Sequence, residues 1–403
     1  MILVETISGF LLLALVGVGF AVLAWWRFAA AVGVALTLIP LWHIRFPVGP
    51  VPVSVPELMS LILFARALPL FAQRSTWTLA WQKLRFLAWP IALLITGLAL
   101  GILRSGAYRT GLGILKSWFL VPLLLGFVLW LAMERGTAKK AHVLAGLIGG
   151  GVFAAVGAIG YIVSGDLAYD NRLTAWYGSP NFLAMYLAPL TVLAFAISRA
   201  AIAHEWQTVS RWAGAIMVLP LLLTRSLGAM GASLAVGAGV LWFGRKATIR
   251  KRVLAVVLAA LVLGAFLYAV FQPPFASRRV IWQVALEIGF SHAFLGIGPG
   301  TFETAYLQNQ PKHPPYPEWA VPHPHSLFFT AWLSAGLMGL AGLVWLFVVL
   351  WRRFRQTKKS PFAGAVALTL MVPLLHGLVD TTLWRADLAT VWWVLVALLV
   401  AAP

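Results

Sequence analysis

Long apolar runs follow one another along this chain, with short polar segments between them. Many of these runs are long enough to cross the roughly 30 Å hydrocarbon core of a bilayer as helices. Of the 403 residues, 61% are hydrophobic and 10% are charged, which is too little charge to cover a soluble protein of this length. The alternating polarity of membrane-barrel strands is absent, so the sequence predicts an all-α polytopic membrane protein.

We expect about twelve or thirteen transmembrane helices in a single transmembrane domain over residues 1–403. No basic stretch precedes the first run, so we expect a retained span and not a cleaved signal peptide. The expected spans are two runs within 6–44 and single runs at about 57–71, 86–103, 113–133, 141–163, 181–201, 211–224, 227–244, 253–271, 326–350, 362–378 and 388–402.

The net charge of +19 comes from 30 Lys and Arg against 11 Asp and Glu, and most of the basic residues lie in short segments between the runs. The positive-inside rule assigns the most basic segments to the cytoplasm. These are 74–85, 135–140, 245–252 and 352–359. The segments then expected outside are 45–56, 104–112, 164–180, 272–325 and 379–387. The first of these is a proline-rich loop, and the second carries Arg104 and Arg109 against the trend. Cysteine is absent, which excludes disulfides and thiol catalysis.

The longest interruption, 272–325, is expected to be an extracytoplasmic catalytic loop that carries short helices. Ser277 is expected to cap a helix along the membrane surface, with Arg278 and Arg279 in its first turn. Arginine side chains fit phosphate oxygens geometrically, although ordinary anchoring at the interface is the alternative. The GIGPG segment at 296–300 lacks a βαβ unit around it, so it indicates a tight turn and not a nucleotide site.

Prolines stiffen the approach to two histidines at the end of this loop, His323 and His325. An imidazole can act as a base or bind phosphate near neutral pH, and two interfacial histidines with structural roles are the alternative. A metal would need a third ligand, from His313 or Glu318, and the spacing matches no strong signature, so we expect none. The prolines are Pro311, Pro314, Pro315, Pro317, Pro322 and Pro324.

Four other polar residues lie in or beside the expected outside segments. Arg172 could line a polar pocket or form a solvated ion pair with Asp170, and Asn181 could cap the helix that follows. Arg225 stands between two apolar runs, where it should face a polar cavity or an anionic partner unless it extends to the interface. Asp380 could orient a histidine or bind a sugar hydroxyl, and a local ion pair with Arg385 is the alternative.

Taken in order, several of these segments resemble the bacterial O-antigen ligase and polymerase superfamily over roughly residues 165–388. Two positions depart from the family pattern. Ser326 stands where the paired-histidine block usually ends in asparagine, and Ser179 replaces the first asparagine of G-N-P-N. The segments that carry the resemblance are NRLTAWYGSPNFLAMYLAPL, TRSLGAMGASL, RRVIWQVALEIGFSHAFLGIGPGTF, HPHSLFFTAWLSAGLMGL and LLHGLVDTTLW.

The resemblance implies a C-type glycosyltransferase on the periplasmic face of the bacterial inner membrane, without a metal or another cofactor. Its donor would be an undecaprenyl-diphosphate-linked glycan, transferred with inversion at the anomeric carbon. A ligase passes the glycan to lipid A–core, and a polymerase passes it to another lipid-linked repeat unit. The family's essential arginines and histidine correspond by position to Arg172 or Arg225, Arg278 or Arg279, and His325 or His323.

The chemistry expected of such an enzyme agrees with these residues. A diphosphate is already a good leaving group, so the reaction needs cations for the departing charge and a base for the acceptor hydroxyl. We expect His325 to be the base, supported by His323, and the four arginines to bind the diphosphate. The expected substrate contacts are Asn181, Asp380 and His313.

Two rival functions share the helical architecture. A flippase or transporter for a lipid-linked glycan would also need cationic cavities, but it would not need a stiffened histidine loop on one face. A peptidoglycan polymerase of the shape-and-elongation type would use an aspartate in the large outer loop, and 272–325 contains none.

Overall fold

The computed structural model of the chain describes residues 2–3, 7–48, 51–168, 170–200, 204–243, 248–270, 273–314, 318–357 and 360–402, and most of these are helical. The all-α class is therefore confirmed. Gln272, Pro315, Pro317 and part of the basic segment 245–252 lie outside the described residues. Within these residues, five helical stretches are long and apolar enough to cross a membrane. They are α4 (Arg74–Ser105), the continuous stretch Tyr108–Glu134, α7 (Lys140–Ser164), α8 (Pro180–Ile197) and α14 (Leu327–Thr357).

The stretch Tyr108–Glu134 consists of α5 (Tyr108–Ile114), a π-helical turn η2 (Leu115–Leu120) and α6 (Val121–Glu134). The total of twelve or thirteen spans stays a prediction, because several other apolar helices are shorter than a full bilayer crossing. The remaining bundle helices are α1 (Ile7–Trp26), α2 (Phe28–Thr37), α3 (Val55–Phe71), α9 (His204–Leu223), α10 (Leu227–Phe243), α11 (Ile249–Val270), α15 (Pro361–His376) and α16 (Ala386–Val400).

The proline-rich loop expected at 45–56 is instead a small hairpin. Strand β2 (Ile44–Val48) pairs antiparallel with β3 (Val51–Ser54), and β1 (Ile2–Leu3) adds a parallel edge. Its alternating valines suit extended backbone, which outweighs the missing N–H groups of its prolines in so short a sheet. Ser54 then caps α3 in a reciprocal pair of hydrogen bonds with Glu57.

Two expected cytoplasmic segments and one expected outside segment prove to be largely helical. Helix α4 begins at Arg74, so the basic segment 74–85 is its first part, and α14 continues through the basic residues to Thr357. Neither stretch contains glycine or proline, and Leu, Ala, Gln, Lys and Arg all favour helix, so the polar sequence extends the helix beyond the apolar run. Of the expected outer segment 104–112, only Gly106 and Ala107 separate α4 from α5.

The turn expected at 296–300 packs against the bundle. Gly298 has φ +92°, and a Cβ there would lie 2.6 Å from the carbonyl oxygen of Gly101 on α4. Opposite it, α14 is kinked at Gly336 (φ +65°), and the Ile297 N–H donates to the Leu333 carbonyl at 2.7 Å. Only glycine combines this backbone shape with so close an approach. The turn is therefore a fixed corner, held closely between α4 and α14.

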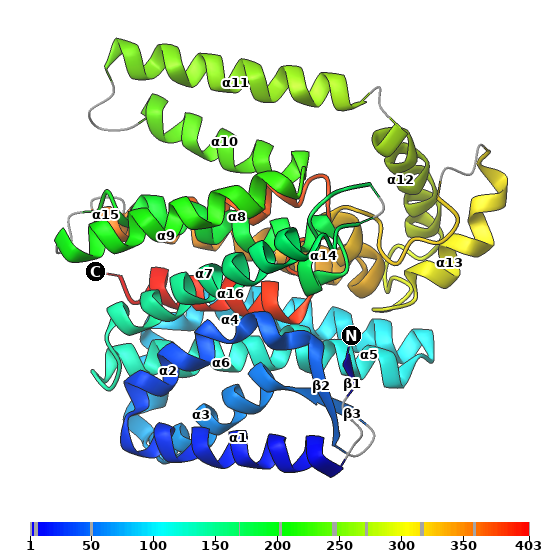
Figure 1. Cartoon of the computed structure of the whole chain (residues 1–403). Helices are drawn as coiled ribbons and strands as arrows, with labels where there is room; N and C mark the ends of the chain where they lie inside the picture. The colour runs from blue at the N-terminus through cyan, green and yellow to red at the C-terminus, as the bar shows by residue number, and fades with distance from the viewer. Residues whose placement is uncertain are drawn as a thin grey trace.

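On both sides of that corner the chain builds a cap over one end of the bundle. The cap contains α12 (Pro273–Ser291), α13 (Phe302–Asn309) and the 3-10 turn η4 (Gln310–Lys312), and Figure 1 places them at the end away from the C-terminus. A second small core, including Ile281, Val284 and Tyr306, holds the cap together. Ser277 lies inside α12 and is buried, so the expected cap at Ser277 is wrong: the prolines at 273 and 274 start the helix earlier.

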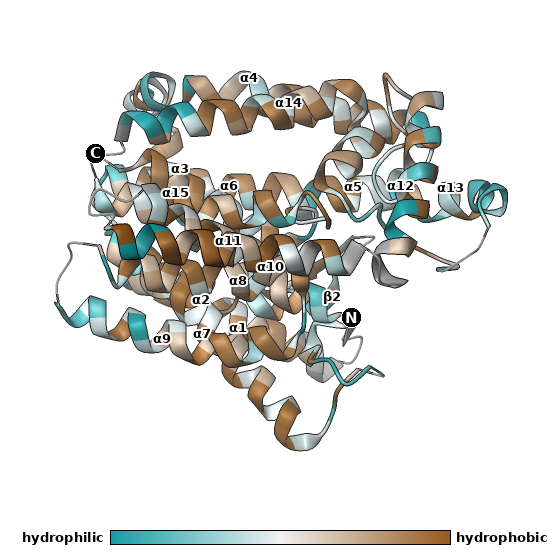
Figure 2. Ribbon diagram, turned by 90° about the horizontal axis from the view of Figure 1, so that it is seen from above, coloured by the Kyte–Doolittle hydropathy of each residue, from teal (hydrophilic) through white to brown (hydrophobic). Residues whose placement is uncertain are grey.

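Figure 2 shows apolar helices across the middle of the molecule and polar segments at its ends. At one end Arg135 bonds the hydroxyls of Ser75 and Thr76, which joins two expected cytoplasmic segments. At the other end, residues from 164–180, 272–325 and 379–387 meet in one hydrogen-bonded cluster. The grouping of segments therefore follows the charge pattern of the sequence.

Candidate functional site

Asp380 stands at the centre of this cluster, in the loop between α15 and α16, and its side chain is 1% exposed. The Nδ1 atom of His325 lies 3.0 Å from its Oδ1, while an Arg278 guanidinium nitrogen lies 3.4 Å from its Oδ2. The Asn181 amide also donates to Oδ2, at 3.2 Å. One carboxylate thus contacts residues from the end of the large loop, from α12 and from the start of α8.

Arg172 extends the network from the segment before α8. Its Nε donates to the carbonyl of Thr224 at 2.7 Å, and its terminal nitrogen donates to the Asn181 amide oxygen at 2.9 Å. Its expected partner Asp170 is 3.7 Å away. Asn181 therefore bridges Arg172 and Asp380. Its predicted role as a helix cap is wrong, because α8 begins at Pro180 without a side-chain cap and the amide is used in this bridge.

The two histidines meet edge to face, with ring centroids 4.5 Å apart, and the ring of Phe182 lies 5.8 Å from His323. His325 has φ +45°, in the left-handed region that non-glycine residues seldom adopt. Such strain persists where surrounding contacts hold it, and it gathers at functional sites. The backbone of His325 is held by the Trp282 indole, which donates to its carbonyl at 3.3 Å.

Electrostatics fix the protonation pattern of the pair. Burial raises the pKa of the Asp380 carboxyl, but the adjacent His325 and Arg278 lower it more, so its pKa lies well below the ordinary value. An ionised carboxylate only accepts hydrogen bonds, so Nδ1 of His325 carries the proton and Nε2 is left as a base. Burial, and next the neighbouring His325, lowers the pKa of His323 to about 4, which keeps His323 neutral at physiological pH.

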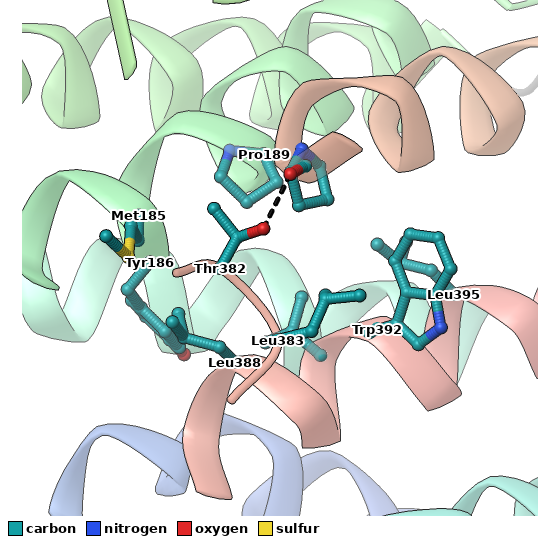
Figure 3. Close-up of a pocket in the computed structure, with 10 residues that line it drawn as sticks. Met185, Tyr186, Pro189, Thr382, Leu383, Leu388, Trp392 and Leu395 are labelled. Atoms are coloured by element: carbon teal, nitrogen blue, oxygen red, sulfur yellow. Dashed lines mark hydrogen bonds between the residues drawn. The ribbon is translucent and has the colours of Figure 1, made fainter. Parts of the chain in front are cut away.

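The loop that carries Asp380 is tied down on both sides of it. Thr382 donates to the Pro373 carbonyl of α15 at 2.6 Å, as Figure 3 shows, and the hydroxyls of Thr381 and Thr330 lie 3.0 Å apart. The cavity drawn there has a volume of about 10 Å³, room for about one water, so it is a packing gap and not a substrate site. The hydrogen bonds of Thr381 and Thr382 therefore fix the position of the Asp380 carboxylate.

Arg385, the alternative partner expected for Asp380, instead bonds both oxygens of Asp387 at 2.7 Å. Its guanidinium also lies over the rings of Phe182 at 4.4 Å and Tyr177 at 5.1 Å. Phe182 therefore touches both the buried ion pair and His323. Sequence reasoning missed it because an apolar residue at the start of an apolar helix carries no signal of its own.

Of the other expected site residues, two are exposed arginines and the third, His313, lies in the outer part of the cap. Arg225 is exposed in the connection between α9 and α10 with φ +49°, next to the Thr224 carbonyl that accepts from Arg172. Arg279 is exposed on α12. His313 pairs with Glu287 at 2.9 Å, which holds the outer part of the cap.

A cation could contact part of the cluster. One ligand atom from each of His323, His325 and Asp380 lies within 4.8 Å of the others, and two imidazoles with a carboxylate form a donor set that zinc accepts. However, Oδ2 of Asp380 already bonds the Arg278 cation, and Oδ1 accepts from His325. That the site works without a metal stays a prediction from the sequence, and a chelator tests it.

The comparison with family models gives one result. Residues 212–344 match a model described as O-antigen ligase. The matched segment contains Arg225, Arg278, Arg279, His323 and His325, whereas Arg172, Asn181 and Asp380 lie outside it. A search of curated proteins finds no match to the chain. The match covers a segment narrower than the resemblance in the sequence, and over residues 212–344 the chain is similar to the O-antigen ligase family.

Proposed function

We propose that the chain is a membrane glycosyltransferase of the O-antigen ligase or polymerase kind, which moves a glycan from undecaprenyl diphosphate to an acceptor hydroxyl. The observation that carries the proposal is the contact of His325 with Asp380, together with Arg278 on the same carboxylate. The family match supports the general class of enzyme and of substrate. The details of the mechanism rest on the geometry of the cluster.

In the proposed reaction the acceptor hydroxyl oxygen attacks the anomeric carbon from the side opposite the diphosphate. The bond from that carbon to the diphosphate oxygen breaks, the configuration inverts, and the hydroxyl proton passes to Nε2 of His325. Asp380 holds the tautomer and stabilises the imidazolium that forms. Neutral His323 supports the His325 ring without adding a second positive charge.

The departing diphosphate carries the developing negative charge. Arg278 and Arg172 lie in the cluster, and Arg225 and Arg279 are exposed near it, which gives the diphosphate up to four guanidinium partners. Guanidinium groups bind phosphate oxygens in pairs and keep their charge at any relevant pH. The glycan hydroxyls would find their polar partner in Asn181.

The proposal also assigns the site to the periplasmic face of the inner membrane, on the basis of the positive-inside rule. Because the chain has no cysteine, single cysteines report topology cleanly. Lys312→Cys in η4 should react with a membrane-impermeant maleimide in intact spheroplasts, whereas Lys139→Cys should react only after permeabilisation. Both lysines are exposed. Labelling in the reverse order would place the histidine loop in the cytoplasm.

The function itself is tested by incubating the purified chain with an undecaprenyl-diphosphate-linked glycan, with and without lipid A–core. Ladders on the carrier lipid indicate a polymerase, and transfer only to lipid A–core indicates a ligase. EDTA should leave the rate unchanged, because the proposed chemistry uses only protein groups. Movement of labelled lipid between leaflets without a new glycosidic bond would favour the flippase, and loss of activity in EDTA would favour a metal on the His323, His325 and Asp380 cluster.

A further inference from the structure

A buried ion pair between Arg385 and Asp387 lies beside the candidate site. The Nε atom and one terminal nitrogen of Arg385 donate to the two oxygens of the Asp387 carboxylate, each at 2.7 Å. The two side chains are 5% and 0% exposed. Removing two charges from water costs about as much free energy as their mutual attraction returns, so a pair of this kind contributes little net stability. What it can fix is the position of the groups around it.

The guanidinium of Arg385 is surrounded by three aromatic rings. Its carbon atom lies 4.8 Å from the ring centre of Trp42, 5.1 Å from that of Tyr177 and 4.4 Å from that of Phe182. A cation is attracted to ring faces at such distances. Trp42 belongs to the 3-10 turn η1 (Ile39–His43), and Tyr177 ends the 3-10 turn η3 (Ala175–Tyr177). One side chain thus joins α8 to two segments that are distant in the sequence.

Arg385 contacts the start of α8, which carries part of the candidate site. Its terminal nitrogen also donates to the Phe182 carbonyl at 3.3 Å. The Phe182 ring lies 5.8 Å from the ring of His323, and the preceding residue, Asn181, donates to Asp380 at 3.2 Å. Because Asn181 and Phe182 are consecutive residues, a contact that fixes one restricts the other. Arg385 therefore influences where the Asn181 amide meets the Asp380 carboxylate.

The same residue also holds the loop on the other side of that hydrogen bond. Asp380 and Arg385 belong to one loop, and Arg385 is the residue directly before α16. Its partner Asp387 lies in the first turn of α16. The ion pair thus fixes the end of the loop, while the hydrogen bond of Thr382 to α15 fixes its middle. The Asp380 carboxylate and the amide that bonds it are therefore both positioned from one guanidinium.

We propose that Arg385, held by Asp387, is a positioning residue that places the start of α8 against the loop of Asp380. Through this placement it keeps the Asp380 carboxylate on Nδ1 of His325. The inference rests on the proposed function, and it adds a residue that acts without touching the reacting groups. A misplacement of about 1 Å can cost about 10²-fold in rate, so a residue of this kind has a measurable effect on kcat.

A paired replacement tests the inference without leaving one charge buried alone. Arg385→Met combined with Asp387→Val puts apolar side chains close in size in both positions, and such an exchange of a buried pair often leaves stability unchanged. Thermal unfolding should therefore occur near the wild-type temperature, while kcat for glycan transfer should fall about tenfold. KM for the donor should change by no more than about twofold, because Arg278 is retained.

Arg385→Lys tests the same role with the charge retained, and it decides the matter if the paired variant does not fold. An ammonium lacks the planar fork that bonds both Asp387 oxygens and lies against the rings, so kcat should again fall about tenfold. The matched control is Arg353→Met. Arg353 donates to the carbonyls of Val400 and Ala402 at 3.1 and 3.2 Å, at the opposite end of α16, so kcat should stay near the wild-type value.

The tautomer of His325 gives a readout that needs no substrate. Nitrogen NMR of protein with labelled histidine distinguishes a proton on Nδ1 from one on Nε2, and His325→Ala identifies the signal among those of the eight histidines. Wild type and Arg353→Met should carry the proton on Nδ1, as the contact with ionised Asp380 requires. The paired variant and Arg385→Lys should show both tautomers.

A wild-type kcat in the folded paired variant or in Arg385→Lys would overturn the inference. An unchanged His325 tautomer in these variants would also overturn it, even with a reduced kcat, because the pair would then act by another route. An equal loss of kcat in Arg353→Met would show that anchoring α16 matters in general, which contradicts a specific role for Arg385. Because the tautomer is measured without substrate, failure of the transferase assay in wild type would count against the proposed function and not against this positioning.

Discussion

Replacing His325 with alanine should lower kcat for glycan transfer by about 10²- to 10⁴-fold, which is the usual contribution of a positioned base. The Nε2 atom of His325 is the proton acceptor that the Asp380 carboxylate leaves available, and alanine offers no substitute. The donor should still bind, because the arginines that hold its diphosphate are unchanged. The measurement is the steady-state kcat and KM of purified protein with a labelled lipid-linked glycan.

Two variants control this experiment. His292→Ala removes an imidazole of the same loop whose Nδ1 lies 3.1 Å from the Ile288 carbonyl oxygen, so kcat should stay near the wild-type value. His323→Gln should leave the acid side of the pH–rate profile where it is, because the pKa of His323 is lowered to about 4 and the group is already neutral above pH 5. A shift of that limb in His323→Gln, or full activity in His325→Ala, would remove the assignment of the base.

Asp380→Asn should be nearly as damaging, with kcat lowered by about 10³-fold. The amide either turns an N–H toward Nδ1 of His325, which favours the tautomer that is protonated on Nε2, or faces the Asn181 and Arg278 donors with one of its own. In a serine protease the equivalent exchange costs about 10⁴-fold through the wrong tautomer. The pKa of Asp380 is held well below its ordinary value, so the wild-type carboxylate stays ionised throughout the neutral range.

The matched control for this change is Asp170→Asn. Asp170 is a partly exposed carboxylate 3.7 Å from Arg172, in the same polar cluster but without an imidazole neighbour. An exposed ion pair of this kind contributes about 0–1 kcal/mol, so kcat should fall by no more than about fivefold. Similar losses in the two variants would mean that charge near the cluster matters, and not the contact of Asp380 with His325.

The sequence alone predicted the helical class and the loops that meet at the site, because hydropathy and basic residues record membrane position directly. It missed the helical state of 74–85, since a polar segment at the end of an apolar run can continue the helix as easily as end it. It missed the hairpin after residue 44 because strands this short have little periodicity.

At the site, sequence reasoning considered Asp380 as a partner for a histidine but left Arg385 as an equal rival. The choice depends on which way the loop after α15 turns, and the hydrogen bond between Thr382 and Pro373 sets this turn. Asn181 was assigned to a helix cap because local rules see only neighbouring residues. Its actual partners, Arg172 and Asp380, are brought together by the packing of distant segments.

A single-turnover experiment tests the central claim most directly. Purified wild-type protein and His325→Ala are each loaded with labelled lipid-diphosphate-linked glycan, and acceptor is then added. Both proteins should retain the donor equally well, and the wild type should pass the glycan to the acceptor at least about 10²-fold faster than the variant. Equal rates of transfer, with the donor bound to both proteins, would contradict the assignment of His325 and Asp380 as the centre of the reaction.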